Sequence, residues 1–181
     1  MKGVWKQLDA WLKEHGPDVV PHLNPPASPD AIAAVERKIG LVFPESLRSS
    51  YLVHNGETED SPGVFCYWNW LSLDRVVEQW EEHVQLQQEY GMDHFGDGQF
   101  NAKQSIPVLW FESTIRYLAV TAAGGEPPLL ELPRHGTPVV VAPSLDEYVR
   151  SIQSGLLIGT YVIEPDFGFN IVPEGLNASG G

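Results

Sequence analysis

The sequence predicts an α+β fold in which helices pack on a mostly antiparallel sheet. Helical patterns of apolar residues cluster in the first half of the 181-residue chain, and β-forming runs cluster in the second half. One helix is expected between these halves and one after the strands, so the order lacks the regular β-α-β alternation of parallel α/β proteins. Hydrophobic residues make up 43% of the chain, which is enough for one full core.

Two amphipathic helices are expected at the start of the chain. Apolar residues recur at helical spacing from Val4 to Leu12, and Gly16-Pro17 ends that helix. After a proline-rich connector, Ser28 is expected to be the N-cap of a second helix. Gly40 is placed to cap its carboxyl end, and its apolar face is Ile32, Val35 and Ile39.

The next segment predicts a third helix, a strand and a fourth helix. Pro44 opens the third helix and Asn55-Gly56 ends it, and its buried residues are expected to be Leu47, Tyr51 and Leu52. The aromatic run Gly63–Trp70 predicts a strand or one arm of a hairpin. Ser72 then caps a helix that ends at Gly91 and buries the stripe Leu73, Val77, Trp80 and Val84.

The second half supplies the rest of the sheet. Ile106–Phe111 and Ile115–Thr121 flank a short turn, and the strands Leu129–Leu132 and Val139–Ala142 extend the sheet. Ser144-Leu145-Asp146-Glu147 is a capping box for a helix that is predicted to run to Gly155. Residues 156–173 are expected to add one strand before a flexible tail. We therefore divide the chain into a domain over residues 1–155 and a C-terminal extension over residues 156–181.

The composition excludes several classes of function. Asp and Glu number 24 against 11 Lys and Arg, and the formal net charge of -13 argues against direct nucleic-acid binding. No apolar run approaches the roughly 20 residues of a membrane helix, and the amino end carries no recognisable secretion signal. The single cysteine, Cys66, can form no internal disulfide. Together these features predict a cytoplasmic protein without membrane contact.

Two groups of residues have the chemistry of a catalytic or metal site, and we interpret both as structural. Cys66 with His54 and Asn55 has the residue types of a thiol hydrolase, but it lies in an aromatic run where buried structural cysteines are commoner. Asp93, His94 and Asp97 fit the spacing of neither a calcium loop nor a zinc motif. We expect no catalytic residue, no metal and no cofactor. A hydrolase stays open as an alternative that would require Cys66 or His54.

Short motifs follow one another in a distinctive order between Trp5 and Ser154. They are Glu36, Gly40-Leu41, Phe43–Leu47, Tyr51, His54–Gly56, Trp70–Leu73, Ile106–Val108, Tyr117–Val120, Val141–Ser144 and Tyr148. In this order and spacing they resemble the SMI1/KNR4 family, also called the SUKH superfamily. The chain departs from the family pattern at Thr121, where many members carry an aspartate, and in the tail beyond Gly155.

The resemblance implies an SMI1/KNR4-like fold and a binding function without enzymatic activity. Many bacterial members look like immunity proteins that neutralise a cognate toxin, whereas fungal members regulate cell-wall synthesis and signalling. The motif residues are mostly architectural. Glu36 is expected to satisfy backbone donors or an arginine rather than to perform chemistry.

The segment from Glu57 to Asp97 combines negative charge with large aromatic side chains. It contains ten carboxylates and one base, Arg75, among tyrosines and tryptophans of the kind found at interface hot spots. Complementary charge speeds the association of such a surface with a basic partner. On a strand, Trp68 should point opposite to its neighbours and serve as an apolar anchor. The predicted partner-binding residues are Glu57, Glu59, Asp60, Tyr67, Trp68, Asp74, Glu78, Glu81 and Glu82.

The leading hypothesis is an immunity protein that occludes the active site of a cognate bacterial toxin with a basic surface. The alternative is a non-catalytic regulatory scaffold in cell-wall or signalling control. A plainer interpretation of the charge also stays open, in which the carboxylates only solvate a helix face.

Overall fold

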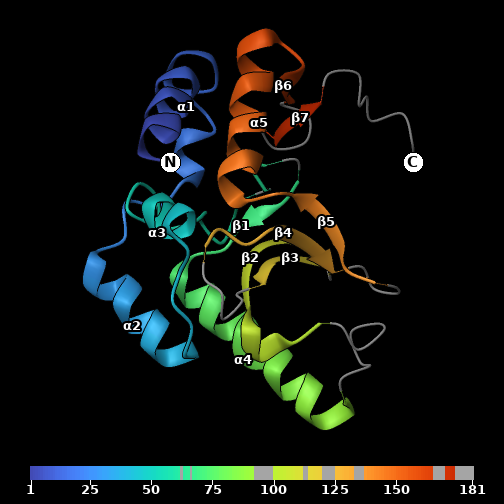
Figure 1. The fold of residues 1–181 in the computed structure, drawn as a ribbon. Helices are drawn as coiled ribbons and strands as arrows, with labels where there is room; N and C mark the ends of the chain where they lie inside the picture. Colours follow the sequence, from blue (N-terminus) through green and yellow to red (C-terminus); the bar gives the residue numbers. More distant parts are fainter. Residues whose placement is uncertain are drawn as a thin grey trace.

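A computed structural model has the α+β fold that the sequence predicts (Figure 1). It describes residues 1–61, 63–65, 67–91, 100–111, 114–119, 125–132, 137–164 and 170–173. The helices are α1 (Lys2–His15), α2 (Pro29–Ile39), α3 (Glu45–Tyr51), α4 (Leu73–Tyr90) and α5 (Leu145–Ile158), with short 3-10 turns η1 (Val20–His22) and η3 (Ala102–Gln104). The strands are β1 (Asn69–Trp70), β2 (Ser105–Phe111), β3 (Thr114–Ala119), β4 (Leu129–Leu132), β5 (Val139–Ala142), β6 (Tyr161–Glu164) and β7 (Asn170–Pro173).

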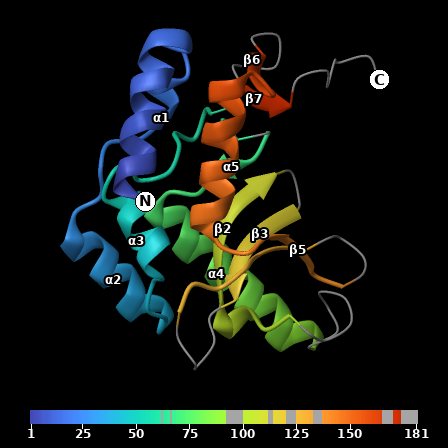
Figure 2. The ribbon, with the colours of Figure 1, turned by 45° about the horizontal axis from the view of Figure 1, so that its top comes forward.

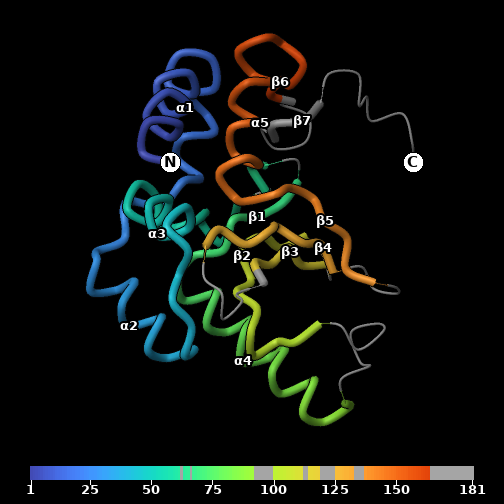
Figure 3. Tube along the Cα trace, viewed as in Figure 1, coloured from blue at the N-terminus to red at the C-terminus, as the bar shows by residue number. Residues whose placement is uncertain are grey.

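Strands β1 to β5 form one antiparallel sheet whose spatial order follows the chain. Successive residues of β3 face opposite sides, as the pleat requires. Ile115 and Tyr117 pack with Val84 of α4 on one face, and Leu118 joins the main core on the other. Helices α1, α3 and α5 lie on that second side (Figures 1 and 2), and α2 runs beside α4 (Figure 3). The sheet is therefore the middle layer.

The helix boundaries follow the predicted caps. Ser28, Ser72 and Ser144 each accept a hydrogen bond from a backbone N–H three residues later, at 3.1, 3.5 and 3.1 Å. Each bond satisfies one of the donors that a helix leaves unpaired at its amino end. Gly40 ends α2 in the left-handed conformation, with φ of 73°. The serine caps explain why α2, α4 and α5 begin where the sequence predicted.

The predicted strand over residues 63–70 is wrong except for its last two residues. Only Asn69–Trp70 forms a strand, and it pairs with Trp110 and Leu109 of β2. Before it, an isolated bridge joins Phe65 to Trp68, and Tyr67 has a positive φ of 68°. A bulky residue in this conformation marks a tight turn rather than an extended strand.

Two helix ends also differ from the prediction. Helix α3 ends at Tyr51, before Asn55-Gly56, and α5 continues through Gly155 to Ile158. The left-handed residue that ends α5 is Gly159. Gly155 instead packs closely against Tyr161. A Cβ at this position would lie 1.8 Å from the Tyr161 ring, so only glycine fits here. Strand β6 then pairs with β7, so this part of the chain holds two strands and not one.

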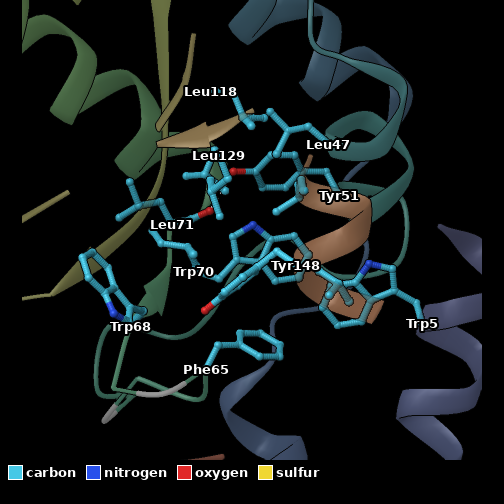
Figure 4. Packing of buried hydrophobic residues seen from close by; sticks show 14 of the residues in the cluster. Trp5, Leu47, Tyr51, Phe65, Trp68, Trp70, Leu71, Leu118, Leu129 and Tyr148 are labelled. Carbon is cyan, nitrogen blue, oxygen red and sulfur yellow. Dashed lines mark hydrogen bonds between the residues drawn. The ribbon is translucent and has the colours of Figure 1, made fainter. Parts of the chain in front are cut away.

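An aromatic cluster joins α1 to β1 in the core (Figure 4). The Trp5 and Trp70 rings are stacked with centroids 4.8 Å apart, and Trp5 Nε1 donates to Ser50 Oγ at 3.0 Å. The Tyr51 hydroxyl donates to the Leu71 carbonyl at 2.8 Å. Offset ring packing of this kind adds to the free energy gained by apolar burial. The cluster therefore fixes β1 and the start of α4 against α1 and α3.

Two glycines with the same backbone conformation give a test of this arrangement. Gly56 and Gly40 have φ of 68° and 73°, but a Cβ on Gly56 would lie 2.5 Å from the Leu71 carbonyl group, whereas one on Gly40 would meet nothing within 4 Å. We expect Gly40→Ala to lower the free energy of unfolding by about 1 kcal/mol, from backbone strain alone. Gly56→Ala should lower it by about 3 kcal/mol or more, because the segments must move apart. Urea unfolding of both variants checks this, and equal losses would contradict the close approach.

Candidate partner-binding surface

The carboxylate of Glu57 is a hub inside the predicted binding segment. Its two oxygens accept hydrogen bonds from Ser61 Oγ at 2.5 Å, the Val64 N–H at 3.0 Å and the Trp70 N–H at 2.9 Å. The residue is only 5% exposed. Burial raises the pKa of Glu57 to about 7, although the hydrogen bonds from Ser61, Trp70 and Val64 act in the opposite direction.

The burial of Glu57 corrects its predicted place on the binding surface. A side chain whose oxygens are occupied by three internal donors is not presented to a partner. The spacing of the acids did not indicate this burial, because the donors lie 4, 7 and 13 positions later in the chain and the donor at Trp70 follows the bridge between Phe65 and Trp68. Glu57 instead holds together the segments next to the exposed acids, through its hydrogen bonds to Ser61, Val64 and Trp70.

Trp68 is also buried, so its predicted role as an outward-facing anchor is wrong. It is 7% exposed, and the guanidinium carbon of Arg116 lies 4.0 Å from the centre of its ring. Arg116 in turn donates to Glu131 Oε2 from Nε and Nη2, at 3.1 and 3.0 Å, and to the Tyr148 hydroxyl at 2.9 Å. The strand alternation assumed for Trp68 fails because the segment turns at Tyr67. Tyr67 itself is half-buried, with its ring 6.4 Å from that of Phe111.

The other six predicted residues are exposed. We call this set the acidic surface: Glu59, Asp60, Asp74, Glu78, Glu81 and Glu82. Four of them project from α4 at spacings of three, four and seven or eight residues, so they share one side of the helix. The neighbouring Thr58 side chain lowers the pKa of Asp60 below its usual value, which favours the charged form.

Two cations partly neutralise the acidic surface. Lys38 Nζ of α2 lies 2.7 Å from Glu81 Oε1, and Arg75 Nη1 lies 3.1 Å from Glu78 Oε2. All four side chains are about half exposed, so these pairs are screened by solvent and each contributes little to stability. Among the described residues, the surface keeps more carboxylates than cations. The pairing of Glu81 with Lys38 was not apparent in the sequence, because Lys38 belongs to a different helix.

A cavity of ≈ 380 Å³ lies where the acidic surface meets the sheet. Residues of three segments line it: the loop at Glu57–Ser61, the stretch from Asn69 to Arg75, and Trp110 of β2. Its size falls in the range of sites that hold small molecules or single side chains, about 300–1,000 Å³. The sequence prediction missed Asn69 and Trp110, since only the pairing of β1 with β2 brings them beside Glu59.

Several residues singled out in the sequence have structural roles. Glu36 accepts from the Phe43 N–H at 2.7 Å and from Arg48 Nη2 at 2.5 Å with both oxygens, which confirms its scaffold role. Trp70 is buried, and Trp80 is half-buried against the core. His54 Nε2 lies 2.9 Å from Asp9 Oδ1, and its Nδ1 lies 3.1 Å from the Asn24 carbonyl. These contacts place His54 in a structural bridge between α1 and the connector.

Most of the residues weighed as catalytic residues or metal ligands, namely Cys66, Asp93, His94 and Asp97, lie outside the described residues. Within the described ranges, no three His, Cys, Asp or Glu side chains gather as a metal site would require. In the same part of the chain, no helix combines the length and apolar character needed to cross a bilayer.

One known protein family matches most of the chain. The model of the SMI1 / KNR4 family (SUKH-1) matches residues 26–151, a range that runs from the connector before α2 into α5 and includes the cavity and the acidic surface.

Similar proteins include regulators of the fungal cell wall. The chain is 28% identical over 79 residues to the cell wall assembly regulator SMI1 of Saccharomyces cerevisiae, covering 41% of this chain and 16% of that protein. It is 23% identical over 91 residues to the glucan synthesis regulatory protein of Neurospora crassa, covering 49% and 17%. It is 34% identical over 64 residues to the mouse F-box only protein 3, covering 35% and 13%. The chain thus matches less than a fifth of the length of each of these relatives.

The buried Glu57 predicts a pH dependence of stability. The folded state binds this proton with a pKa of about 7, against 4.5 for the ordinary side chain, so the folded state holds a proton between these values that the unfolded chain has lost. The contribution is complete below pH 4.5 and is lost as the pH rises to about 7, by about 3 kcal/mol of unfolding free energy.

Glu57→Gln should remove this component, because the amide does not titrate. Its NH2 group would also face one of the N–H donors, so the variant should be less stable at every pH. The measurement is urea unfolding of wild type and Glu57→Gln between pH 4.5 and 8, with Glu59→Gln as the exposed control. A stability difference between wild type and Glu57→Gln that does not shrink with rising pH would contradict the assignment.

Proposed function

The chain belongs to the SMI1/KNR4 family (SUKH-1), and on this premise we propose that it is a non-catalytic binding domain whose acidic surface engages a basic partner protein. The observation that carries the proposal is the gathering of six exposed carboxylates on α4 and the adjoining loop. A cluster of one sign of charge raises the association rate with a partner of opposite charge and disfavours wrong partners.

We further propose that the partner is a bacterial toxin and that the protein is its cytoplasmic immunity protein. Blocking the cationic cleft of such an enzyme needs no chemistry from the inhibitor, only a complementary surface that binds before the toxin acts. Steering by charge meets this demand for speed. Immunity by occlusion therefore fits a domain that offers charge and shape, and in which Glu36 and His54 are engaged in internal contacts.

A second candidate function is a regulatory scaffold in cell-wall or signalling control. It is favoured by the names of the fungal relatives, which describe regulators of cell-wall assembly and glucan synthesis. The two candidates predict different partners: one toxin-like protein at equimolar ratio, or several components of an envelope or signalling assembly. Purification of the tagged protein from its source cells at low and high salt distinguishes them, and protection of cells that express the captured toxin domain establishes immunity.

Charge reversal tests the acidic surface itself. Because Glu78, Glu81 and Glu82 are exposed, replacing all three with Lys should leave the fold intact. It should slow association with the partner by at least about tenfold at low salt, and the deficit should shrink as salt is added. Surface plasmon resonance at two ionic strengths, with circular dichroism for the fold, measures both effects.

The matched control changes the net charge by the same amount elsewhere. Glu14, Asp18 and Glu147 are exposed and lie on α1, the following turn and α5. Their triple Lys variant should retain most of the wild-type association rate. If the α4 variant binds as fast as wild type, or if both variants lose rate equally, the acidic surface is not the contact.

A further inference from the structure

The cavity beside the acidic surface has an unusual charge arrangement. Glu59 stands at its rim, the buried carboxylate of Glu57 forms part of its wall, and Arg75 contributes the single cationic side chain among its lining residues. Arg75 is already engaged with Glu78 at 3.1 Å. The lining therefore leaves one exposed carboxylate, Glu59, without a matching cation in the described part of the chain.

The remaining walls suit a flat polar group. Trp110 lines the cavity and is half-buried. Asn69 and Ser61 add polar side chains on the neighbouring wall. The hydrogen bond from Asn69 Nδ2 to the Ser61 carbonyl, at 2.9 Å, fixes these two residues relative to each other. A side chain entering here meets an aromatic surface and a carboxylate at once.

We propose that this cavity receives an arginine side chain of the partner protein, with Glu59 as its counter-ion and Trp110 as the surface on which the guanidinium stacks. The inference rests on the proposed function, because it assumes a basic protein partner. Arginine fits better than lysine, since its planar guanidinium stacks on aromatic rings and forms paired hydrogen bonds with a carboxylate. Arginine side chains that fill a pocket are among the commonest interface hot spots.

The opposite charges of Glu59 and Arg75 make the proposal specific. Glu59→Gln removes the attractive charge, whereas Arg75→Gln removes the charge that repels an incoming guanidinium. The two variants should therefore shift the affinity in opposite directions. A general effect of the protein's net charge would shift the affinity in the same two directions, so a control variant outside the cavity is needed. Glu89 is exposed and lies fourteen residues beyond Arg75 on α4, which is about 21 Å along the helix, and it belongs neither to the lining residues nor to the acidic surface.

The experiment titrates Nα-acetyl-L-arginine amide into the protein labelled with ¹⁵N and follows the indole N–H signal of Trp110 by NMR. We expect saturable shifts of Trp110 with millimolar affinity, weakened about three- to fivefold by Glu59→Gln and strengthened by Arg75→Gln. Glu89→Gln should leave the affinity within about twofold of wild type. The citrulline analogue, which has the same shape without the charge, should produce no saturable shift.

Several results would overturn the inference. They are the absence of shifts at Trp110, equal binding of the citrulline analogue, or equal weakening by Glu59→Gln and Glu89→Gln. Tighter binding of free L-arginine than of the capped form would assign the cavity to a small metabolite rather than a partner side chain. The proposed function fails separately: if the α4 charge reversal leaves partner association unchanged while the cavity still binds the capped arginine, the acidic surface is rejected and the cavity stands.

Discussion

The buried carboxylate of Glu57 holds together the part of the molecule from which the acidic surface projects. It joins three places along the chain, Ser61, Val64 and Trp70, to one side chain. Two neighbouring hydrogen bonds make the same connection: Glu57 N–H donates to the Trp70 carbonyl, and the Asn55 side-chain Oδ1 accepts from the Leu73 N–H at the start of α4. Removing the carboxylate would leave the loop of Glu59 and Asp60 held to the helix that carries the other acids by fewer hydrogen bonds. A buried acid with three internal partners thus positions the exposed acids beside it.

Local signals account for what the sequence predicted well. The serine caps of α2, α4 and α5 and the strands β4 and β5 depend on residues within a few positions, and all appear where expected. The errors lie where distant contacts override local preference. The aromatic run before Trp70 has the composition of a strand, but it forms a turn. In this turn the Val64 N–H donates to Glu57 and the Trp68 ring lies against Arg116. Gly155 resembles a helix end, but it is a contact for Tyr161.

In the candidate surface, too, local patterns were predicted correctly and features that depend on distant contacts were not. Exposed acids on one side of a helix can be read from spacing, and six of the nine predicted residues are exposed. The burial of Glu57 and Trp68 could not be predicted from the sequence, because composition does not reveal whether a charged or aromatic side chain finds internal partners. The cavity escaped prediction altogether. It exists only because β1 pairs with β2, which brings Trp110 to a loop more than 40 positions earlier in the chain.

The matched family range does not mark the limits of this folding unit. It begins at residue 26, yet Trp5 of α1 stacks on Trp70 and hydrogen-bonds Ser50, both of which lie inside the range. At the other end, Ile163 of β6 lies so close to Gly16 that a Cβ there would come within 2.1 Å of its side chain. Helix α1 therefore contacts both the shared core and the C-terminal hairpin. Since Trp70 also lines the cavity, α1 supports the proposed arginine site through the ring it stacks on, although it contributes no lining residue.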